Sequence, residues 1–262
     1  MNYLTIEMPA YKPMYKTWKR YGWKKPEEKA NTREVLLQAG RGYCMYCYVR
    51  VLVAGKFYGQ LEHGIERANS AWLAECVPNI GLACSLCNES FKKVNQNERM
   101  LGTEQIDRFH SKARCAVYQK RKQCTVPCKA LRELQKEYHQ SEKAHFILQP
   151  MGTTGEKSGQ KLTIAYDILK DKFLPADNPL YDQQDRKFIE SHIQRFHLND
   201  PEYRTRKLME YVKLVVDMAG ELPEYEYNHL AVELFAEKIS ELSKEERLKI
   251  CEKIYIIQFA SI

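Results

Sequence analysis

No uncharged apolar run in this 262-residue sequence approaches the roughly 18 residues that a membrane-spanning helix needs. The N-terminal segment MNYLTIEMPAYKPMYK also lacks an apolar stretch before a small-residue cleavage site, so it does not resemble a secretory signal. Internal repeats and low-complexity segments are missing as well. We therefore expect a cytoplasmic protein with no membrane contact, long enough for one large domain or two small ones.

Cysteine is well represented, with nine residues, and a reducing compartment argues against disulfides. Cys44 and Cys47 form one C-x2-C pair, and Cys84 and Cys87 form another. Two such pairs can offer four thiolates to one tetrahedral zinc ion, leaving no open position, so we expect a structural Zn²⁺. The 36 residues between the pairs are more than a zinc ribbon contains, so this insert must fold into a unit of its own.

Two alternatives stand for Cys115, Cys124 and Cys128. The Cys124-x3-Cys128 pair could bind a second metal together with His110 or His139, or these thiols could simply pack between helices. The two remaining cysteines are expected in the core: Cys76 and Cys251.

Charged residues are unevenly distributed between the two halves of the chain. Residues 1–140 contain 24 Lys+Arg against 13 Asp+Glu, whereas residues 141–262 contain 17 against 21. A basic half indicates a polyanionic partner, although a solvated charged surface explains the same composition.

The hydrophobic pattern predicts an α+β protein in which helices dominate. A helix over 31–40 would be capped by Asn31 or Thr32. The other expected elements are strands at 49–54, 56–63 and 80–84, short helical pieces around 68–74 and 85–96, helices within 104–146, strands near 162–166 and 173, and helices over 185–198, 201–220, 226–241 and 243–259.

Within the insert, Glu62 and His63 end a predicted strand. Asn79 follows 16 residues after His63, Asn88 comes directly after the last cysteine of the second pair, and Lys92 lies one helical turn later. The segments LEHGIER and PNIGLACSLCNESFKK resemble the HNH (ββα-metal) endonuclease family with four-cysteine zinc knuckles. Its pattern is an acid–His pair, an Asn opening the second strand, C-x-x-C followed by Asn or His, then Lys.

The resemblance covers roughly residues 41–96 and implies metal-dependent hydrolysis of phosphodiester bonds. It implies that His63 is the base that activates water and that Asn79 orients the His63 ring. It also implies that Glu62 and Asn88 bind a catalytic divalent cation, most simply Mg²⁺, a hard ion that prefers oxygen ligands.

Phosphate would be held by Lys92, Lys93 and Arg67. Taken singly, such residues also have structural explanations, because a lysine on a helix is usually solvated and an asparagine often caps a turn. The sequence departs from the family at two positions. Glu62 replaces the common Asp, and Glu66 stands where many members have Pro, which weakens the expectation for the loop but removes no needed functional group.

A second, weaker resemblance lies further along. The stretch SHIQRFHLNDPEYRTRKLMEY, residues 191–211, is similar to the tail of HNH proteins paired with ATPases in anti-phage defence, including Septu-like and retron-associated systems. It implies an ATPase partner and a nuclease kept inactive until triggered. A helical extension that packs on the core is the alternative.

Together these patterns predict a small ββα-metal core with a structural zinc site, embedded in a largely α-helical protein. The expected regions are a basic arm and helix (1–40), the nuclease core (41–100), a helical and irregular connection (101–184) and a C-terminal helical region (185–262). The expected activity is endonucleolytic cleavage of double-stranded DNA, leaving 5′-phosphates as the family does. The alternatives are a non-catalytic zinc module that binds nucleic acid, and an RNase of the same fold.

Overall fold

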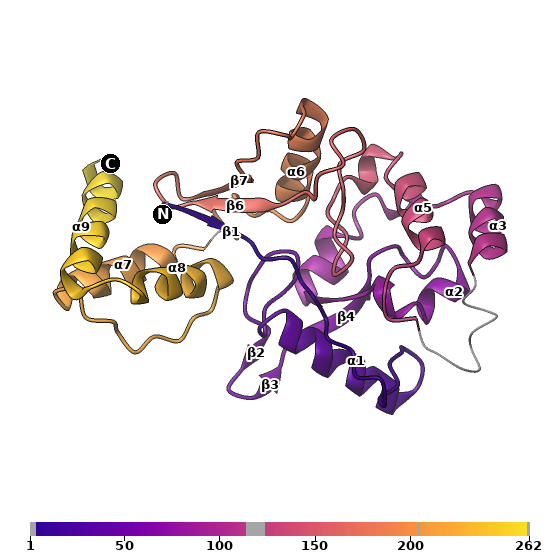
Figure 1. Cartoon of the computed structure of the whole chain (residues 1–262), viewed down its shortest axis with the longest axis horizontal. Helices are drawn as coiled ribbons and strands as arrows, with labels where there is room; N and C mark the ends of the chain where they lie inside the picture. Colours follow the sequence, from indigo (N-terminus) through magenta and orange to yellow (C-terminus); the bar gives the residue numbers. More distant parts are fainter. Residues whose placement is uncertain (1–3, 114–123, 204, 261–262) are drawn as a thin grey trace.

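The computed structural model describes residues 4–113, 124–203 and 205–260 and has the α+β arrangement expected from the sequence (Figure 1). Its strands are β1 (Thr5–Glu7), β2 (Leu52–Val53), β3 (Lys56–Phe57), β4 (Gly59–His63), β5 (Ile80–Cys84), β6 (Ile164–Asp167) and β7 (Lys172–Pro175). Its α-helices are α1 (Pro26–Ala39), α2 (Ala71–Ala74), α3 (Thr103–Lys112), α5 (Lys129–Tyr138), α6 (Gln183–Arg195), α7 (Lys207–Asp217), α8 (Leu230–Ser240) and α9 (Lys244–Ala260). Shorter helical turns are η1 (Val77–Asn79), η2 (Leu86–Phe91), η3 (Gln96–Arg99) and η4 (Glu142–Ala144).

The described strands form three small antiparallel sheets, ordered β1-β6-β7, β2-β3 and β4-β5. In the first sheet, Thr5 pairs with Asp167 and Glu7 with Ala165, so the N-terminal arm joins a sheet of the connecting region. The sequence pattern predicted no strand in that arm, because a three-residue strand whose partner lies about 160 residues away leaves no local periodicity.

The β4-β5 hairpin and the π-helical turn η2 form the part of the fold that carries the candidate site. Glu62 lies opposite Gly81, and His63 lies opposite Ile80. Gly81 is required by a close approach of the backbone, since a Cβ there would lie 2.7 Å from the carbonyl oxygen of Gln149. The loop around Gln149 therefore packs directly on the hairpin beside Glu62.

Helix α1 begins five residues earlier than expected. Pro26 occupies its first turn, where proline's missing N–H and fixed φ are tolerated. Asn31 and Thr32 are therefore inside the helix rather than at its cap. Thr32 is buried, and its hydroxyl accepts a hydrogen bond from the Gly22 backbone N–H at 2.9 Å, which ties the preceding arm to the helix. The expected strand at 49–54 is reduced to the two residues of β2.

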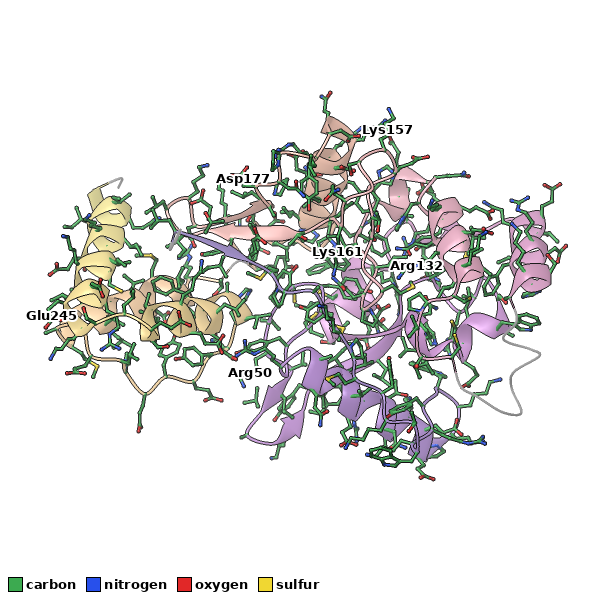
Figure 2. All side chains as sticks on the ribbon, in the orientation of Figure 1. Arg50, Arg132, Lys157, Lys161, Asp177 and Glu245 are labelled. Atoms are coloured by element: carbon green, nitrogen blue, oxygen red, sulfur yellow. The ribbon has the colours of Figure 1, made fainter. Side chains whose placement is uncertain are left out.

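Helices α7, α8 and α9 lie together at one end of the molecule, remote from α1 and β4 (Figure 1). Their shared core is apolar and includes Val212, Phe235 and Ile254. Arg50, labelled in Figure 2, connects this end to the rest of the chain, because its guanidinium pairs with Glu233 of α8 at 3.0 Å. In the described parts of the chain, the helices are too short or too polar to cross a membrane.

Candidate active site

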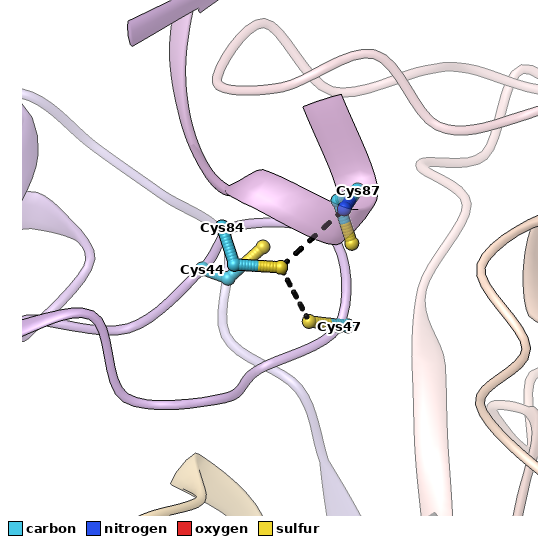
Figure 3. Close-up of side chains that lie close together, drawn as sticks. All are labelled: Cys44, Cys47, Cys84 and Cys87. Atoms are coloured by element: carbon cyan, nitrogen blue, oxygen red, sulfur yellow. Dashed lines mark hydrogen bonds between the residues drawn. The ribbon is translucent and has the colours of Figure 1, made fainter. Parts of the chain in front are cut away.

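The four cysteines predicted to bind zinc are brought together in one cluster (Figure 3). The sulfur atoms of Cys44, Cys47, Cys84 and Cys87 all lie within 4.8 Å of one another, and Cys47 Sγ is 3.6 Å from Cys84 Sγ. Sulfurs bound to one tetrahedral zinc at about 2.3 Å are separated by roughly 3.8 Å, so this spacing suits a metal ion such as Zn²⁺ and is far too long for a disulfide.

The electrostatics of the cluster also favour a cation. Hydrogen bonds from Cys44 and then Cys47 lower the pKa of Cys84, so one thiolate is stabilised by its neighbours. Burial followed by contacts with the other thiols raises the pKa of Cys87, and the hydrogen bond with Cys44 is the main cause that raises the pKa of Cys47. A second negative charge is therefore disfavoured among these sulfurs until a metal ion compensates it.

The structure bears on the two alternatives left open for Cys115, Cys124 and Cys128. His110 Nε2 lies 2.8 Å from the hydroxyl of Ser70. Among the described residues, the only cluster suited to a metal is the four-cysteine one, and Cys115 lies outside those residues. The pKa of Cys76 rises to about 12, mainly because the thiol is buried and further because of the Cys124 and Cys128 thiols.

A cleft of about 900 Å³ lies along β4, and its lining contains six of the seven residues expected to act on substrate or catalytic metal. Those six are Glu62, His63, Arg67, Asn88, Lys92 and Lys93. The seventh, Asn79, is fully buried behind it. Residues far apart in the sequence also contribute, most notably Trp23 and two cations of α1.

Glu62 lies at the bottom of this cleft and is 2% exposed. Its Oε1 accepts a hydrogen bond from the Tyr46 hydroxyl, and its Oε2 forms an ion pair with Lys92 Nζ. Tyr46 lies between Cys44 and Cys47, so the fold of the cysteine cluster positions the Glu62 carboxylate, the candidate metal ligand. No local sequence pattern indicates this bond, because a tyrosine between two cysteines has no characteristic role.

His63, the last residue of β4, is buried and lies against Trp23, with 4.4 Å between the ring centroids. Its Nε2 is 3.1 Å from the carbonyl oxygen of Ala74, an acceptor, so Nε2 carries the proton and Nδ1 keeps its lone pair. Burial, reinforced by Lys92 and Arg67, lowers the pKa of His63 to about 4 despite the bond to Ala74. The ring is therefore neutral at pH 7 and able to accept a proton.

The Asn79 side chain forms no hydrogen bond with the His63 ring, which corrects the role expected for it. Its Oδ1 accepts a bond from the Ile65 N–H at 2.8 Å, and its Nδ2 donates to the Ile65 carbonyl at 2.9 Å. The carbonyl that orients His63 is that of Ala74. Asn79 thus fixes the bend that follows β4, and it acts on the histidine only through the backbone.

Glu62 and Asn88 have the oxygen donors that a Mg²⁺ ion prefers. Asn88 donates through Nδ2 to Gln60 Oε1 at 2.5 Å, which leaves its amide oxygen as the atom that can ligate. Both oxygens of Glu62 already accept bonds. The residues therefore fit a hard divalent cation on the condition that the cation replaces the Lys92 ammonium at Glu62.

Lys92 was expected to hold phosphate, but its side chain is 6% exposed and bonds both Glu62 and the His63 carbonyl. Burial of Glu62 explains the difference, because a carboxylate removed from water needs a cation beside it. Lys93 and Arg67 are exposed in the lining of the cleft and remain available to bind an anion. Arg67 lies over the Trp23 ring at 5.4 Å.

A second buried ion pair supports the loop after His63. Glu66 and Arg99 bond at 2.8 Å, and the Tyr138 hydroxyl bonds both groups. Arg99 also donates to the carbonyls of Lys92 and Val94. Glu66, at the position where many members of the resembled family have proline, is thus held by a cation 33 residues away, and no local sequence pattern indicates that partner.

No family model, curated protein or solved structure matches this chain.

Proposed function

We propose that this protein is a metal-dependent endonuclease of the HNH type. The observation that carries the proposal is the convergence of Glu62, His63 and Asn88 on one cleft, beside a four-cysteine cluster that could hold zinc. A carboxylate and an amide oxygen can hold a hard divalent cation, and a neutral histidine can accept a proton from water, so the three groups suit metal-assisted phosphodiester hydrolysis. Their arrangement on a β-hairpin and the following helical turn also agrees with the ββα pattern of the family that the sequence resembles.

In this proposal His63 accepts the proton of the attacking water at Nδ1, while Ala74 holds the opposite nitrogen. Trp23 covers the ring and excludes bulk water from one side. A Mg²⁺ ion held by Glu62 and Asn88 would supply positive charge for the phosphate and the leaving oxygen. Before binding, Lys92 neutralises Glu62, so the carboxylate keeps a cationic partner in both states.

Double-stranded DNA is the proposed substrate, and the cytoplasm is the proposed location. The basic balance of residues 1–140 supports a nucleic-acid substrate. The acidic balance of residues 141–262 fits a protein contact better, which agrees with an ATPase partner in anti-phage defence. An RNase of the same fold and a non-catalytic zinc module that binds nucleic acid are the competing functions.

Plasmid nicking in the presence of Mg²⁺ tests the activity. We expect wild type to convert supercoiled DNA to nicked and linear forms, and His63→Ala to lose at least about a hundredfold of that rate. His145→Ala, which changes a histidine outside the cleft, is the matched control and should cut like wild type. Cleavage by His63→Ala at the wild-type rate would remove His63 from the mechanism.

Two further measurements separate the competing functions. Parallel assays on a structured RNA and on duplex DNA distinguish an RNase from a DNase. The non-catalytic module predicts two results together. Salt-sensitive DNA binding should persist in Glu62→Gln, His63→Ala and Asn88→Ala. Neither these variants nor wild type should cut DNA or RNA, with or without a candidate ATPase.

A further inference from the structure

Helix α1 supplies a wall of the cleft that the HNH resemblance does not include. Pro26, Lys29, Ala30 and Arg33 all line the cleft from this helix. Lys29 and Arg33 are four residues apart, so they share one helical face, separated by about 6 Å along the axis. Both side chains are exposed, and both precede the nuclease-like segment in the sequence.

Aromatic rings hold these two cations in place. Lys29 Nζ lies 4.5 Å from the centroid of the Trp23 ring, and the guanidinium carbon of Arg33 lies 5.4 Å from that of Phe57. Such contacts favour one orientation without neutralising the charge. Trp23 also contacts His63, so the position of Lys29 is linked to that of the candidate base.

The exposed cations of the cleft are notable for being gathered in one place. On other surfaces some exposed cations pair with carboxylates, as in Lys207–Glu210, and others form no ion pair among the described residues, as with Lys249 and Lys253 of α9. Within the described residues, the four exposed cations of the cleft form no ion pair: Lys29, Arg33, Arg67 and Lys93.

Carboxylates in the cleft do not offset this charge. Glu62 and Glu66 are buried and already paired with Lys92 and Arg99. Glu89 is the one exposed acid in the lining, and it accepts a bond from Gln60. The cleft therefore presents four exposed cations against a single exposed carboxylate, which is a surface suited to an extended anion.

We propose that Lys29 and Arg33 bind the phosphate backbone of the nucleic acid and thereby hold it across His63. This inference takes its ligand, a nucleic acid, from the proposed function, whereas the positions of the cations come from the structure. Two cations separated along α1 contact two phosphates, and Arg67 and Lys93 extend the basic surface beyond them. A polynucleotide meets all four groups, whereas a mononucleotide reaches only part of the set.

Binding of a fluorescein-labelled 30-base-pair DNA duplex, and of one of its strands alone, tests the proposal. Fluorescence anisotropy is measured across a series of NaCl concentrations with the full-length protein and no added divalent cation. The test variant is Lys29→Ala/Arg33→Ala. A matched control, Lys249→Ala/Lys253→Ala, removes two exposed lysines at the same spacing on α9, at the other end of the molecule (Figure 1).

We expect the test variant to bind the duplex roughly tenfold more weakly near physiological salt. Its slope of log affinity against log salt should decrease by up to about 2, because two phosphate contacts are lost. The charge-preserving variant Lys29→Arg/Arg33→Lys should retain most of the affinity, and the α9 control should bind within about twofold of wild type. Thermal melting of each variant verifies that the fold is retained.

Several outcomes overturn the inference. One is a folded Lys29→Ala/Arg33→Ala protein with wild-type affinity and salt slope. Equal loss in the α9 control shows that overall charge, rather than the α1 wall, determines binding. Equal displacement of the duplex by a mononucleotide at matched phosphate concentration shows a small-anion site, and a wild type that binds neither probe excludes a polynucleotide ligand.

The experiments can refute the phosphate-binding role of α1 and the proposed nuclease activity independently of each other. If the Lys29→Ala/Arg33→Ala variant loses binding and wild type does not cleave, the phosphate-binding role of α1 is supported and the proposed nuclease activity is not. If wild type cleaves and the α1 variant binds normally, the nuclease activity is supported and the phosphate-binding role of α1 is refuted.

Discussion

The cleft region and the α7–α9 end of the molecule place their charges differently. In the cleft, Lys92 and Glu62 pair with side chains 6% and 1% exposed, and Arg99 is fully buried against Glu66. In α7, by contrast, the Lys213–Asp217 pair has side chains 56% and 52% exposed. The cleft region therefore buries two of its ion pairs, whereas the pair on α7 is exposed to water.

This difference agrees with the proposed position of the active site. Burying an ion pair costs desolvation energy that its mutual attraction often fails to recover, so such pairs are a poor way to stabilise a fold. Exposed pairs cost little and contribute little. The core that α7, α8 and α9 share is apolar, whereas the buried charges of the cleft agree with the proposed function, in which the Glu62 carboxylate receives a cation.

The largest expected effect comes from the cysteine cluster. Zinc bound by four thiolates contributes roughly 10 kcal/mol or more of apparent free energy, comparable to the whole stability of a domain. We expect one zinc per chain by metal analysis, and Cys84→Ser should lose the metal and most amide protection in β4 and β5. Cys251→Ala, a buried thiol of α9, is the matched control and should keep its zinc.

The cysteine experiment also tests the separation of the two regions. If Cys84→Ser removes protection from amide hydrogen exchange in α7–α9 as fully as in β4, the two regions unfold as one unit. Their different charge placement would then not correspond to separate stability. A well-folded wild type without zinc would refute the structural metal.

The next effect concerns the buried pair at Glu62. Lys92→Met leaves this carboxylate buried without a cation, so we expect the free energy of unfolding to fall by about 3–5 kcal/mol in urea titrations. Adding Glu62→Gln to Lys92→Met should recover part of that loss, because the unpaired charge is gone. Lys213→Ala, the exposed counterpart, should leave the urea midpoint unchanged within error, and a similar loss there would break the comparison.

A pH dependence should come from His192 of α6, which is fully buried beneath the first cysteine pair. Its Nδ1 accepts the Ile147 N–H at 3.1 Å, and burial lowers the pKa of His192 to about 3. Because this folded pKa lies below the unfolded value of about 6.5, the unfolded chain binds more protons, and stability falls as pH decreases from about 6.5 towards 3.

That loss should reach roughly 2 kcal/mol by pH 5. Urea titrations at pH 7 and pH 5 with zinc present measure it, and His192→Gln should lose less than wild type between the two values. An equal loss in His192→Gln would assign the acid sensitivity to other groups.

The smallest effect is expected from Tyr138→Phe, which removes the hydroxyl shared by Glu66 and Arg99 while their ion pair stays. The unfolding free energy should decrease by about 1–3 kcal/mol, since a buried carboxylate loses one of its donors. Tyr203→Phe, at an exposed tyrosine, is the control and should be neutral. No change in Tyr138→Phe would show that Arg99 alone satisfies Glu66.

Much of the site could be predicted because its information is local. Two C-x2-C pairs define four thiols at metal-binding spacing, and the structure confirms that they meet. The acid–His pair at a strand end and an asparagine after the last cysteine place three groups on one hairpin and its helical turn, and the structure confirms that they share a cleft. The α+β class and the C-terminal helices also follow from periodicity and capping residues.

Partner choice between distant segments could not be predicted in this way. Lys92 looks like a solvated helical lysine until the burial of Glu62 is known, and Asn79 was assigned to His63 although it holds Ile65. The first helix was placed five residues late, because Asn31 or Thr32 was taken as its cap, whereas Pro26 occupies its first turn.

The sequence by itself therefore determined the functional groups and their local order, since cysteine spacing and strand alternation act over a few residues. Tertiary structure alone decided what those groups contact: Trp23 against His63, Tyr46 and Lys92 on Glu62, and Lys29 and Arg33 along the cleft. The physical reason is that desolvation and long-range packing select these partners, and neither leaves a periodic pattern along the chain.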